Sequence, residues 1–332
     1  MSLQFFLMRD GILRQDMELL AMEAPKITMD SEREVKLTLQ GRFLPLESAN
    51  LLTDHIVSML DGQTIGEFVV TSCKTIYEGD CKLWQLEAGD QTVIVARHRQ
   101  KKSRFFRKGS DYMVILQQLL GECGIFRLLA DSCDDVLQCD RQWELGAKTL
   151  DILNELLQEI GFEELWFDSD GYARLQRYCP PVVENVAYFY GQKEREIEPQ
   201  LSGEWDVFSA KNVFVAVADS PEYQQSWMAT ASNDDPASPV STVNLGRVMA
   251  PVLVVDNVAS QGALQAFVER VRDENMLSAQ TVAFSTKPEI HQIRELFWLE
   301  HPELDGIYRE VAWTMDFDSW TMSHEGRRVY FL

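Results

Sequence analysis

Neighbouring carboxylates are the side chains of this sequence whose spacing could support chemistry. Glu163 is followed directly by Glu164, and one residue separates Asp168 from Asp170. Two carboxyl groups close together could act as general acid and general base on a glycosidic bond. Pairs of this kind also arise by chance in a chain with 52 acidic residues. A carboxylate-dependent hydrolase of the cytoplasm is therefore the alternative function that this pattern leaves open.

Residues 168–179 also contain the first ligands of a calcium-binding loop. Asp168, Asp170 and Gly171 fit the start of such a loop, but Cys179 stands at the twelfth position, where a glutamate is required. Residues 164–175 place an Asp-Gly turn between two apolar stretches, which is typical of a β-hairpin. The pattern therefore predicts a hairpin and no calcium site.

Histidines and cysteines form no recognisable catalytic or metal-binding motif. The five histidines are scattered along the chain, which favours surface or interface positions for His55, His98, His291, His301 and His324. The six cysteines form neither a CxxC pair nor a Cys/His cluster with zinc-like spacing, and we expect reduced thiols. The sequence also lacks the nucleophile-elbow, phosphate-loop, HExxH and dinucleotide-binding patterns. We therefore assign no catalytic, cofactor-binding or metal-binding residues.

A basic segment, residues 97–108 (RHRQKKSRFFRK), contrasts with the rest of the chain. Basic residues interleaved with aromatic ones could follow a nucleic-acid backbone and stack on its bases. In a chain of net charge −21, the segment could instead pair with the acidic surface of another copy, with Phe105 and Phe106 as anchors. A solvated loop is a third interpretation. We favour self-association or a protein partner.

The overall charge excludes some classes of partner. A net charge of −21 opposes general attraction to nucleic acids and anionic lipids, because both carry the same sign as the protein. No uninterrupted apolar run approaches the roughly 20 residues that a membrane-spanning helix needs. We therefore expect neither specific nucleic-acid binding nor membrane insertion.

Residues 1–96 are rich in short β-like segments. Val35, Leu37 and Leu39 alternate with polar residues, as in a half-buried strand. Further strands are expected at 66–75, 81–87 and 92–96, with turn-forming residues at 61–62, 78–80 and 88–90. Short strands with turns at this spacing predict an N-terminal β-barrel-like domain.

Residues 97–181 contain a pattern that occurs twice, 37 positions apart. The first copy consists of Gly109, Ile115, Leu116, Leu119, Leu120, Gly124 and Ile125, and its counterparts are Gly146, Ile152, Leu153, Leu156, Leu157, Gly161 and Phe162. The aliphatic residues of each copy share one face of a helix, and the closing glycine supplies a left-handed cap. The region is therefore predicted to be a helical middle domain that ends in the hairpin.

Pro180 and Pro181 mark a boundary, because neither can donate a ladder hydrogen bond or continue a helix. In residues 182–332 we expect a turn-rich segment at 231–242, a helix over 260–276 with Ser260 as its N-cap, and strands at 186–190, 212–218, 281–285 and 311–317. The complete prediction is an α+β fold. It has two related small β-barrel domains, a helical and hairpin middle region, and a helix inserted in the second barrel.

Several segments, taken in their order along the chain, resemble the baseplate hub proteins of contractile phage tails and related prophage particles. They are residues 141–146 (RQWELG), 154–162 (NELLQEIGF), 166–171 (WFDSDG), 206–214 (DVFSAKNVF), 233–242 (NDDPASPVST), 245–247 (LGR), 313–317 (WTMDF) and 322–324 (MSH). The resemblance runs from about residue 108 to the C-terminus. It extends to the hub part of type VI secretion spike proteins.

The resemblance implies a structural tail component without enzymatic activity. Such hubs form a homotrimeric ring between the tail tube and the central spike, in which two similar barrels per subunit give a pseudo-sixfold face. The implied partners are further copies of the chain, the spike, the tube and other baseplate proteins. The implied location is the baseplate of a virion tail assembled in the host bacterial cytoplasm. Whether the particle is a phage, a tailocin or a secretion-like machine stays open.

Overall fold

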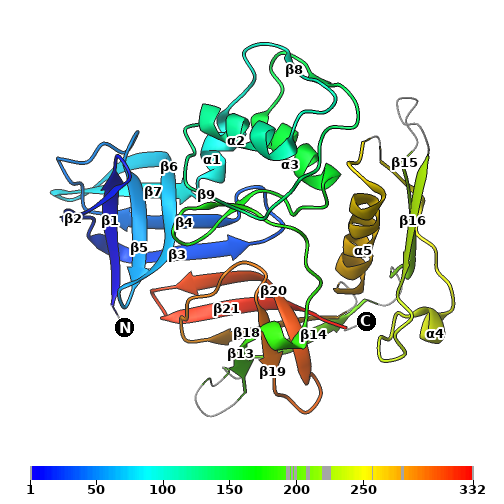
Figure 1. The fold of residues 1–332 in the computed structure, drawn as a ribbon. Coiled ribbons are helices and arrows are strands. Elements are labelled where there is room, and N and C mark those ends of the chain that lie inside the picture. The colour runs from blue at the N-terminus through cyan, green and yellow to red at the C-terminus, as the bar shows by residue number, and fades with distance from the viewer. Residues whose placement is uncertain are drawn as a thin grey trace.

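The computed structural model describes residues 2–191, 195, 197, 200–206, 210–218, 226–255, 257–277 and 280–330. Strands predominate, and most of them belong to one large sheet (Figure 1). Its first half comprises β1 (Leu3–Arg9), β2 (Ile12–Glu18), β3 (Ala21–Asp30), β4 (Leu37–Phe43), β5 (His55–Leu60), β6 (Gln63–Glu78) and β7 (Cys81–Gly89). Its second half comprises β13 (Val186–Tyr190), β14 (Ser202–Trp205), β18 (Gln280–Thr286), β19 (Leu296–Leu299), β20 (Gly306–Asp316) and β21 (Thr321–Arg328).

The two halves of this sheet meet where β3 pairs antiparallel with β20. Met29 lies opposite Trp313, and the hydroxyls of Thr28 and Thr314 are 3.1 Å apart. Apolar residues of β20, including Trp313 and Met315, are buried in the same core as the N-terminal strands. The main hydrogen-bonding path runs from β14 to β2 as an open series of 11 strands, and β13 and β19 branch from it. The structure is therefore mostly β with few helices, which confirms the β part of the predicted α+β fold, whereas the two barrels are not confirmed.

The strand expected at 92–96 is wrong, because residues Thr92–Arg97 form the short helix α1. A short run of apolar, β-branched residues has no periodicity that distinguishes a strand from a buried helix. The buried carboxylate of Asp90 decides the outcome, since it accepts the backbone N–H groups of Thr92 at one oxygen and of Lys36 and Leu37 at the other. The region therefore turns away from the sheet directly after β7.

Lys36 also departs from the predicted alternation. It falls on the polar side of the expected strand, yet only 4% of its surface is exposed. Its ammonium group donates to the carbonyls of Ser31 and Arg33, both at 3.1 Å. The loop between β3 and β4 thus surrounds the ammonium group, and its backbone carbonyls provide the hydrogen bonds that a buried cation needs.

The middle region contains the two predicted helices, α2 (Tyr112–Glu122) and α3 (Thr149–Glu159). Gly124 and Gly161 follow these helices with φ of +82° and +73°, the left-handed conformation expected of the closing glycines. Two short strands, β8 (Arg104–Phe106) and β10 (Arg141–Trp143), pair antiparallel beside the helices. The predicted hairpin is also present as β11 (Trp166–Phe167) and β12 (Ala173–Leu175), and β12 pairs with β9 (Leu128–Ala130).

A separate three-stranded sheet packs on the third predicted helix. The sheet consists of β15 (Val213–Ala218), β16 (Trp227–Ser232) and β17 (Leu253–Val254). The helix α5 (Gln261–Leu277) lies against β15 and β16, as Figure 1 shows. The Ser260 hydroxyl accepts the N–H of Ala263 at 3.1 Å, which confirms the predicted N-cap. The remaining short elements are η1 (Val183–Asn185) and α4 (Thr242–Leu245).

Residues 207–209 of the motif at 206–214 lie outside the described part of the chain. The domain limits at 96 and 181 stay predictions. No helix among the described residues combines the length and apolar character needed to cross a membrane.

Candidate functional site

Two of the four carboxylates considered as a catalytic acid and base, Asp168 and Glu163, hold the hairpin and the segment before it in place. Asp168 accepts the backbone N–H of Tyr172 at 2.8 Å and the guanidinium of Arg174 at 2.7 Å, which closes the turn between β11 and β12. Glu163 forms an ion pair with Arg294. Each of these two carboxylates therefore has a cationic partner and a positioning role, and the turn interpretation of residues 168–171 is confirmed.

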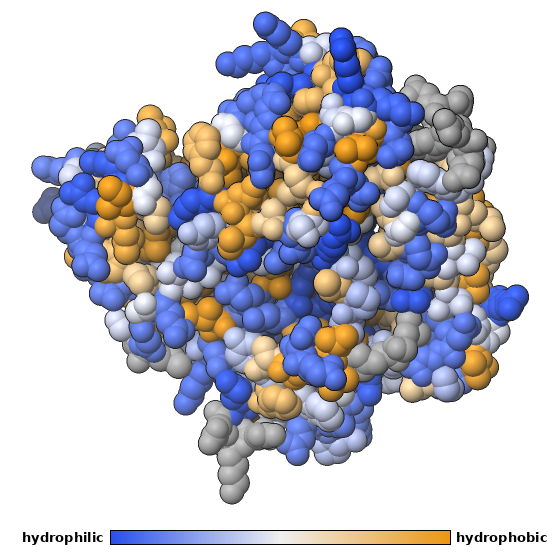
Figure 2. Space-filling model, viewed as in Figure 1, coloured by the Kyte–Doolittle hydropathy of each residue, from blue (hydrophilic) through white to orange (hydrophobic). Residues whose placement is uncertain are grey.

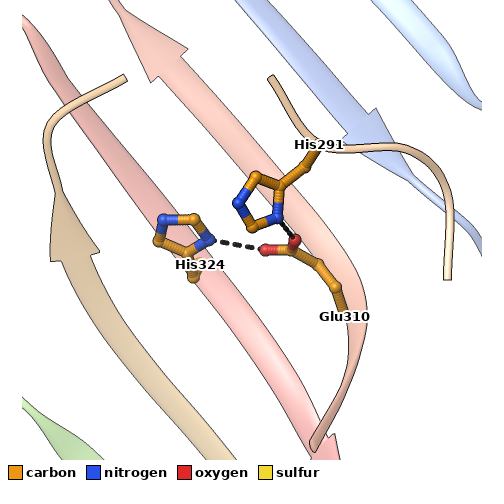
Figure 3. Close-up of side chains that lie close together, drawn as sticks. All are labelled: His291, Glu310 and His324. Carbon is orange, nitrogen blue, oxygen red and sulfur yellow. Dashed lines mark hydrogen bonds and ion pairs between the residues drawn. The ribbon is translucent and has the colours of Figure 1, made fainter. Parts of the chain in front are cut away.

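Two of the five histidines meet in the interior, which corrects the expectation of surface positions for them. Figure 3 shows His291 and His324 on either side of the Glu310 carboxylate. His291 comes from the segment between β18 and β19, whereas Glu310 and His324 lie on the adjacent strands β20 and β21. All three side chains are completely buried. Nδ1 of His324 is 2.6 Å from one carboxylate oxygen, and Nδ1 of His291 contacts the other.

Both ring nitrogens of His324 have a hydrogen-bonding partner. Nε2 is 2.8 Å from the Thr286 hydroxyl, and this hydroxyl also donates to the carbonyl of Lys287 at 2.9 Å. Nδ1 is bound to the Glu310 carboxylate. His324 thus links strand β21 to Glu310 on one side and to the end of β18 on the other.

His291 completes the network. Burial raises the pKa of the Tyr190 hydroxyl, which is 2.6 Å from Nε2 of His291. Nδ1 of the same ring contacts Glu310. Burial alone would raise the pKa of Glu310, but electrostatic attraction to His324 and His291 and the hydrogen bonds from both rings hold it below the usual 4.5. The cluster is a hydrogen-bonded polar network inside the protein.

The same three side chains are the described group that could hold a metal ion, since their ligand atoms lie within 4.8 Å of one another. Zinc sits about 2.0–2.1 Å from nitrogen and oxygen ligands, which places two tetrahedral ligands about 3.3 Å apart. The Nδ1 of His324 and its Glu310 oxygen are 2.6 Å apart. This separation matches a hydrogen bond, and it is shorter than the spacing of two ligand atoms on one tetrahedral ion.

One signal in the sequence points to this cluster, although no motif does. Glu310 and its neighbour Arg309 are charged residues within a strand in which Ile307, Tyr308 and Val311 are buried. A charged residue in such a strand requires a buried partner. The partners themselves lie 14 and 19 residues away, so only the fold could identify them.

The basic segment begins at the end of α1 and includes β8. Arg104 donates to the Gln100 side-chain oxygen at 2.8 Å and forms an ion pair with Glu122. Phe106 packs against Trp143, with ring centroids 6.2 Å apart, whereas Phe105 is exposed. Only one of the two phenylalanines is therefore available as an external anchor.

The 37-residue repeat is larger than the helical pattern alone indicated. Strands β8 and β10 are also 37 positions apart, and they pair with each other. Isolated bridges join Arg99 to Lys148 and Val136 to Asp111, and a shift of 37 residues converts one bridge into the other. The two copies are thus related by an internal pseudo-twofold symmetry in which each supplies a strand to the other.

Comparison with known proteins bears on the fold alone. No protein-family model matches the sequence, and no curated protein sequence matches it significantly. The tail protein from Neisseria meningitidis MC58 is similar over 99% of this chain and 97% of its own, with a TM-score of 0.68 and 14% sequence identity. The 43 kDa tail protein of prophage MuSo2 from Shewanella oneidensis is similar over 98% of each chain, with a TM-score of 0.65 and 13% identity.

This is the fold of phage tail proteins. The tail-protein fold also occurs in the E. coli c3393 protein, a component of the type VI secretion system with structural similarity to the T4 bacteriophage tail proteins gp27 and gp5. That protein has a TM-score of 0.58 and 11% identity, over 98% of this chain and 77% of its own. The resemblance seen in the sequence motifs is therefore confirmed at the level of the fold.

Proposed function

We propose that this chain is a structural hub of a phage-like contractile tail, and that three copies form a ring that joins the tail tube to the central spike. The observation that carries the proposal is the likeness to two tail proteins over almost the whole of this chain and of theirs. The proposed partners are further copies, the spike, the tube and other baseplate proteins. The proposed location is the baseplate of a virion tail assembled in the bacterial cytoplasm.

The two halves of the large sheet support this role. A trimer that joins a sixfold tube to a threefold spike needs two similar tube-facing elements in each subunit. The strands β1–β7 and the strands of the C-terminal half supply two β units in one continuous sheet. We propose that these units act as the two related barrels of the hub.

A non-enzymatic role fits the chemistry of the charged groups. Among the carboxylates considered for a hydrolase, Asp168 and Glu163 are held by arginines. The buried histidine cluster has its polar atoms engaged in hydrogen bonds and lies away from the surface. We therefore propose a structural component without hydrolase activity.

Co-expression with the spike protein and the tube protein of the same particle tests the proposal. We expect a complex in which three copies of this chain, about 114 kDa from three times 38.1 kDa, are bound to one spike, as measured by native mass spectrometry. Electron microscopy of intact particles should place the chain between tube and spike. A chain that binds neither partner, or that lies elsewhere in the particle, would contradict the hub role.

A further inference from the structure

Residues 97–108, here called the basic tip, carry charge that the rest of the chain does not neutralise. The tip contributes +7 to a net charge of −21, so the remaining residues carry −28. Arg104 is the only cation of the tip that forms an ion pair with a described carboxylate, Glu122. The described residues provide no such partner for Arg97, Arg99, Lys101, Lys102, Arg107 and Lys108.

The tip lies at an outer end of the molecule. Figure 1 places β8 at the far end of the middle region, away from the large sheet. Figure 2 shows hydrophilic side chains that project from this end, with hydrophobic atoms between them. A hollow of about 410 Å³ lies there, and Lys101, Lys102 and Arg104 contribute to its lining. The tip is therefore accessible to another macromolecule.

The tip exposes large apolar side chains, which a simple solvated loop does not need. Phe105 is 49% exposed, and Leu145, in the turn that pairs with Gln100, is 69% exposed. Neighbouring residues of a strand face opposite sides, so Phe105 points away from the packed pair of Phe106 and Trp143. Protein interfaces combine such apolar anchors with a polar rim.

We propose that the basic tip docks on the acidic surface of a second copy of this chain. Charge complementarity selects this occupant, because every copy presents an excess of negative charge outside the tip. A ring of three copies needs two different surfaces on each subunit, and the tip supplies one of them. Nucleic acid fits less well, since the remaining charge of −28 would repel its phosphates. The proposal rests on the trimeric ring proposed above and assigns one of its contacts.

The test compares the full-length chain with two charge-reversed variants by light scattering, over salt from about 50 to about 500 mM. K101E/K102E reverses two exposed cations of the tip. K74E/K82E makes the same change in charge on the exposed lysines of β6 and β7 and serves as the matched control. We expect the unmodified chain and the control to form trimers that dissociate at high salt, and K101E/K102E to associate at least tenfold more weakly.

F105A removes the apolar anchor without a change in charge and should also weaken association at least tenfold. Circular dichroism and thermal unfolding establish that each variant is folded. If K101E/K102E and F105A form trimers as well as the control, the tip contact is overturned while the hub proposal stands. If the unmodified chain stays monomeric throughout, the contact is likewise overturned, and binding to the spike decides the hub role separately.

Fluorescence anisotropy with a labelled single-stranded DNA tests whether the tip binds nucleic acid instead of a second copy of the chain. Binding by the unmodified chain that is lost in K101E/K102E, with no change in the state of association, would overturn the protein contact in favour of nucleic acid. If the unmodified chain does not bind DNA and K101E/K102E loses the trimer, the result supports the contact between copies.

Discussion

Arg104 and Arg141 occupy the same position in the two copies of the internal repeat, and each forms an ion pair with the glutamate that ends the helix of its own copy. The partners are Glu122, the last residue of α2, and Glu159, the last residue of α3. Each guanidinium also lies over an aromatic ring of its own strand, Phe106 or Trp143. The repeat has therefore kept an interaction. Arg141 is more buried than Arg104, and it also forms an ion pair with Glu155.

This difference predicts unequal effects of removing the two arginines. Arg141→Ala should lower the free energy of unfolding by about 3 kcal/mol, because the side chain is only 11% exposed and its loss leaves the buried Glu159 without its cationic partner. Arg104→Ala should cost about 1 kcal/mol, since both partners are more exposed. Urea denaturation measures both values. Arg107→Ala, at an exposed position without a described ion pair, is the control, and equal losses in all three variants would contradict the argument.

Glu310 should make the protein sensitive to acid. Its pKa is lowered in the folded state, so its contribution is complete above the unfolded value near 4.5 and is lost as the pH falls through the folded value. Glu310→Gln should cost about 3 kcal/mol at pH 7, because two buried histidines lose their carboxylate. The difference from the unmodified chain should shrink below pH 4.5. A difference that stays constant with pH in urea titrations would show that only packing was lost, and Glu303→Gln on the surface is the control.

The contribution of Glu159 to the free energy of unfolding should depend on pH in the opposite sense to that of Glu310. Burial raises its pKa from 4.5 to about 7, although Arg141 lowers it, so the folded chain holds this proton more tightly than the unfolded chain. Stability at this site should therefore fall as the pH rises from 4.5 to about 7, by at most about 3 kcal/mol. Glu159→Gln should remove this part of the slope of the free energy of unfolding against pH, measured by urea denaturation. Glu122→Gln removes the equivalent, more exposed carboxylate, and an equal loss of slope in both variants would refute the role of burial.

Ser260 should contribute to the stability of α5 through its hydroxyl. Ser260→Ala removes the acceptor of the Ala263 N–H and should cost about 1 kcal/mol, whereas Ser260→Asp keeps an acceptor and should cost little. Thermal unfolding of the two variants measures the difference. Equal loss in both would mean that the cap contributes nothing.

Local signals explain which elements could be predicted from the sequence. The helices α2, α3 and α5 each combine an apolar face with a cap or a closing glycine, and all of this information lies within one segment. The hairpin β11–β12 has its turn residues between its strands. The helix α1 resembles a strand in the sequence, because Asp90, the residue that redirects the chain there, acts through hydrogen bonds to a distant loop.

Long-range features could not be predicted in the same way. The pairing of β3 with β20 depends on the register of two strands that periodicity does not relate to each other. The partners of Glu310 lie on other elements, and each histidine alone resembles a surface residue. Sequence order of the motifs indicated the tail-protein fold, but the contacts that unite its halves became visible only in the structure.

The pairing of β3 with β20 can form only after the ribosome has synthesised both strands. Thr28 and Thr314 are 286 positions apart, and a ribosome that adds about 5–20 residues per second needs roughly 15–60 s to make the second after the first. During that interval β3 presents an unpaired edge, which is a template for aggregation. The nascent chain thus has a vulnerable period that ends only when its last strands emerge, and truncated products would keep that edge open permanently.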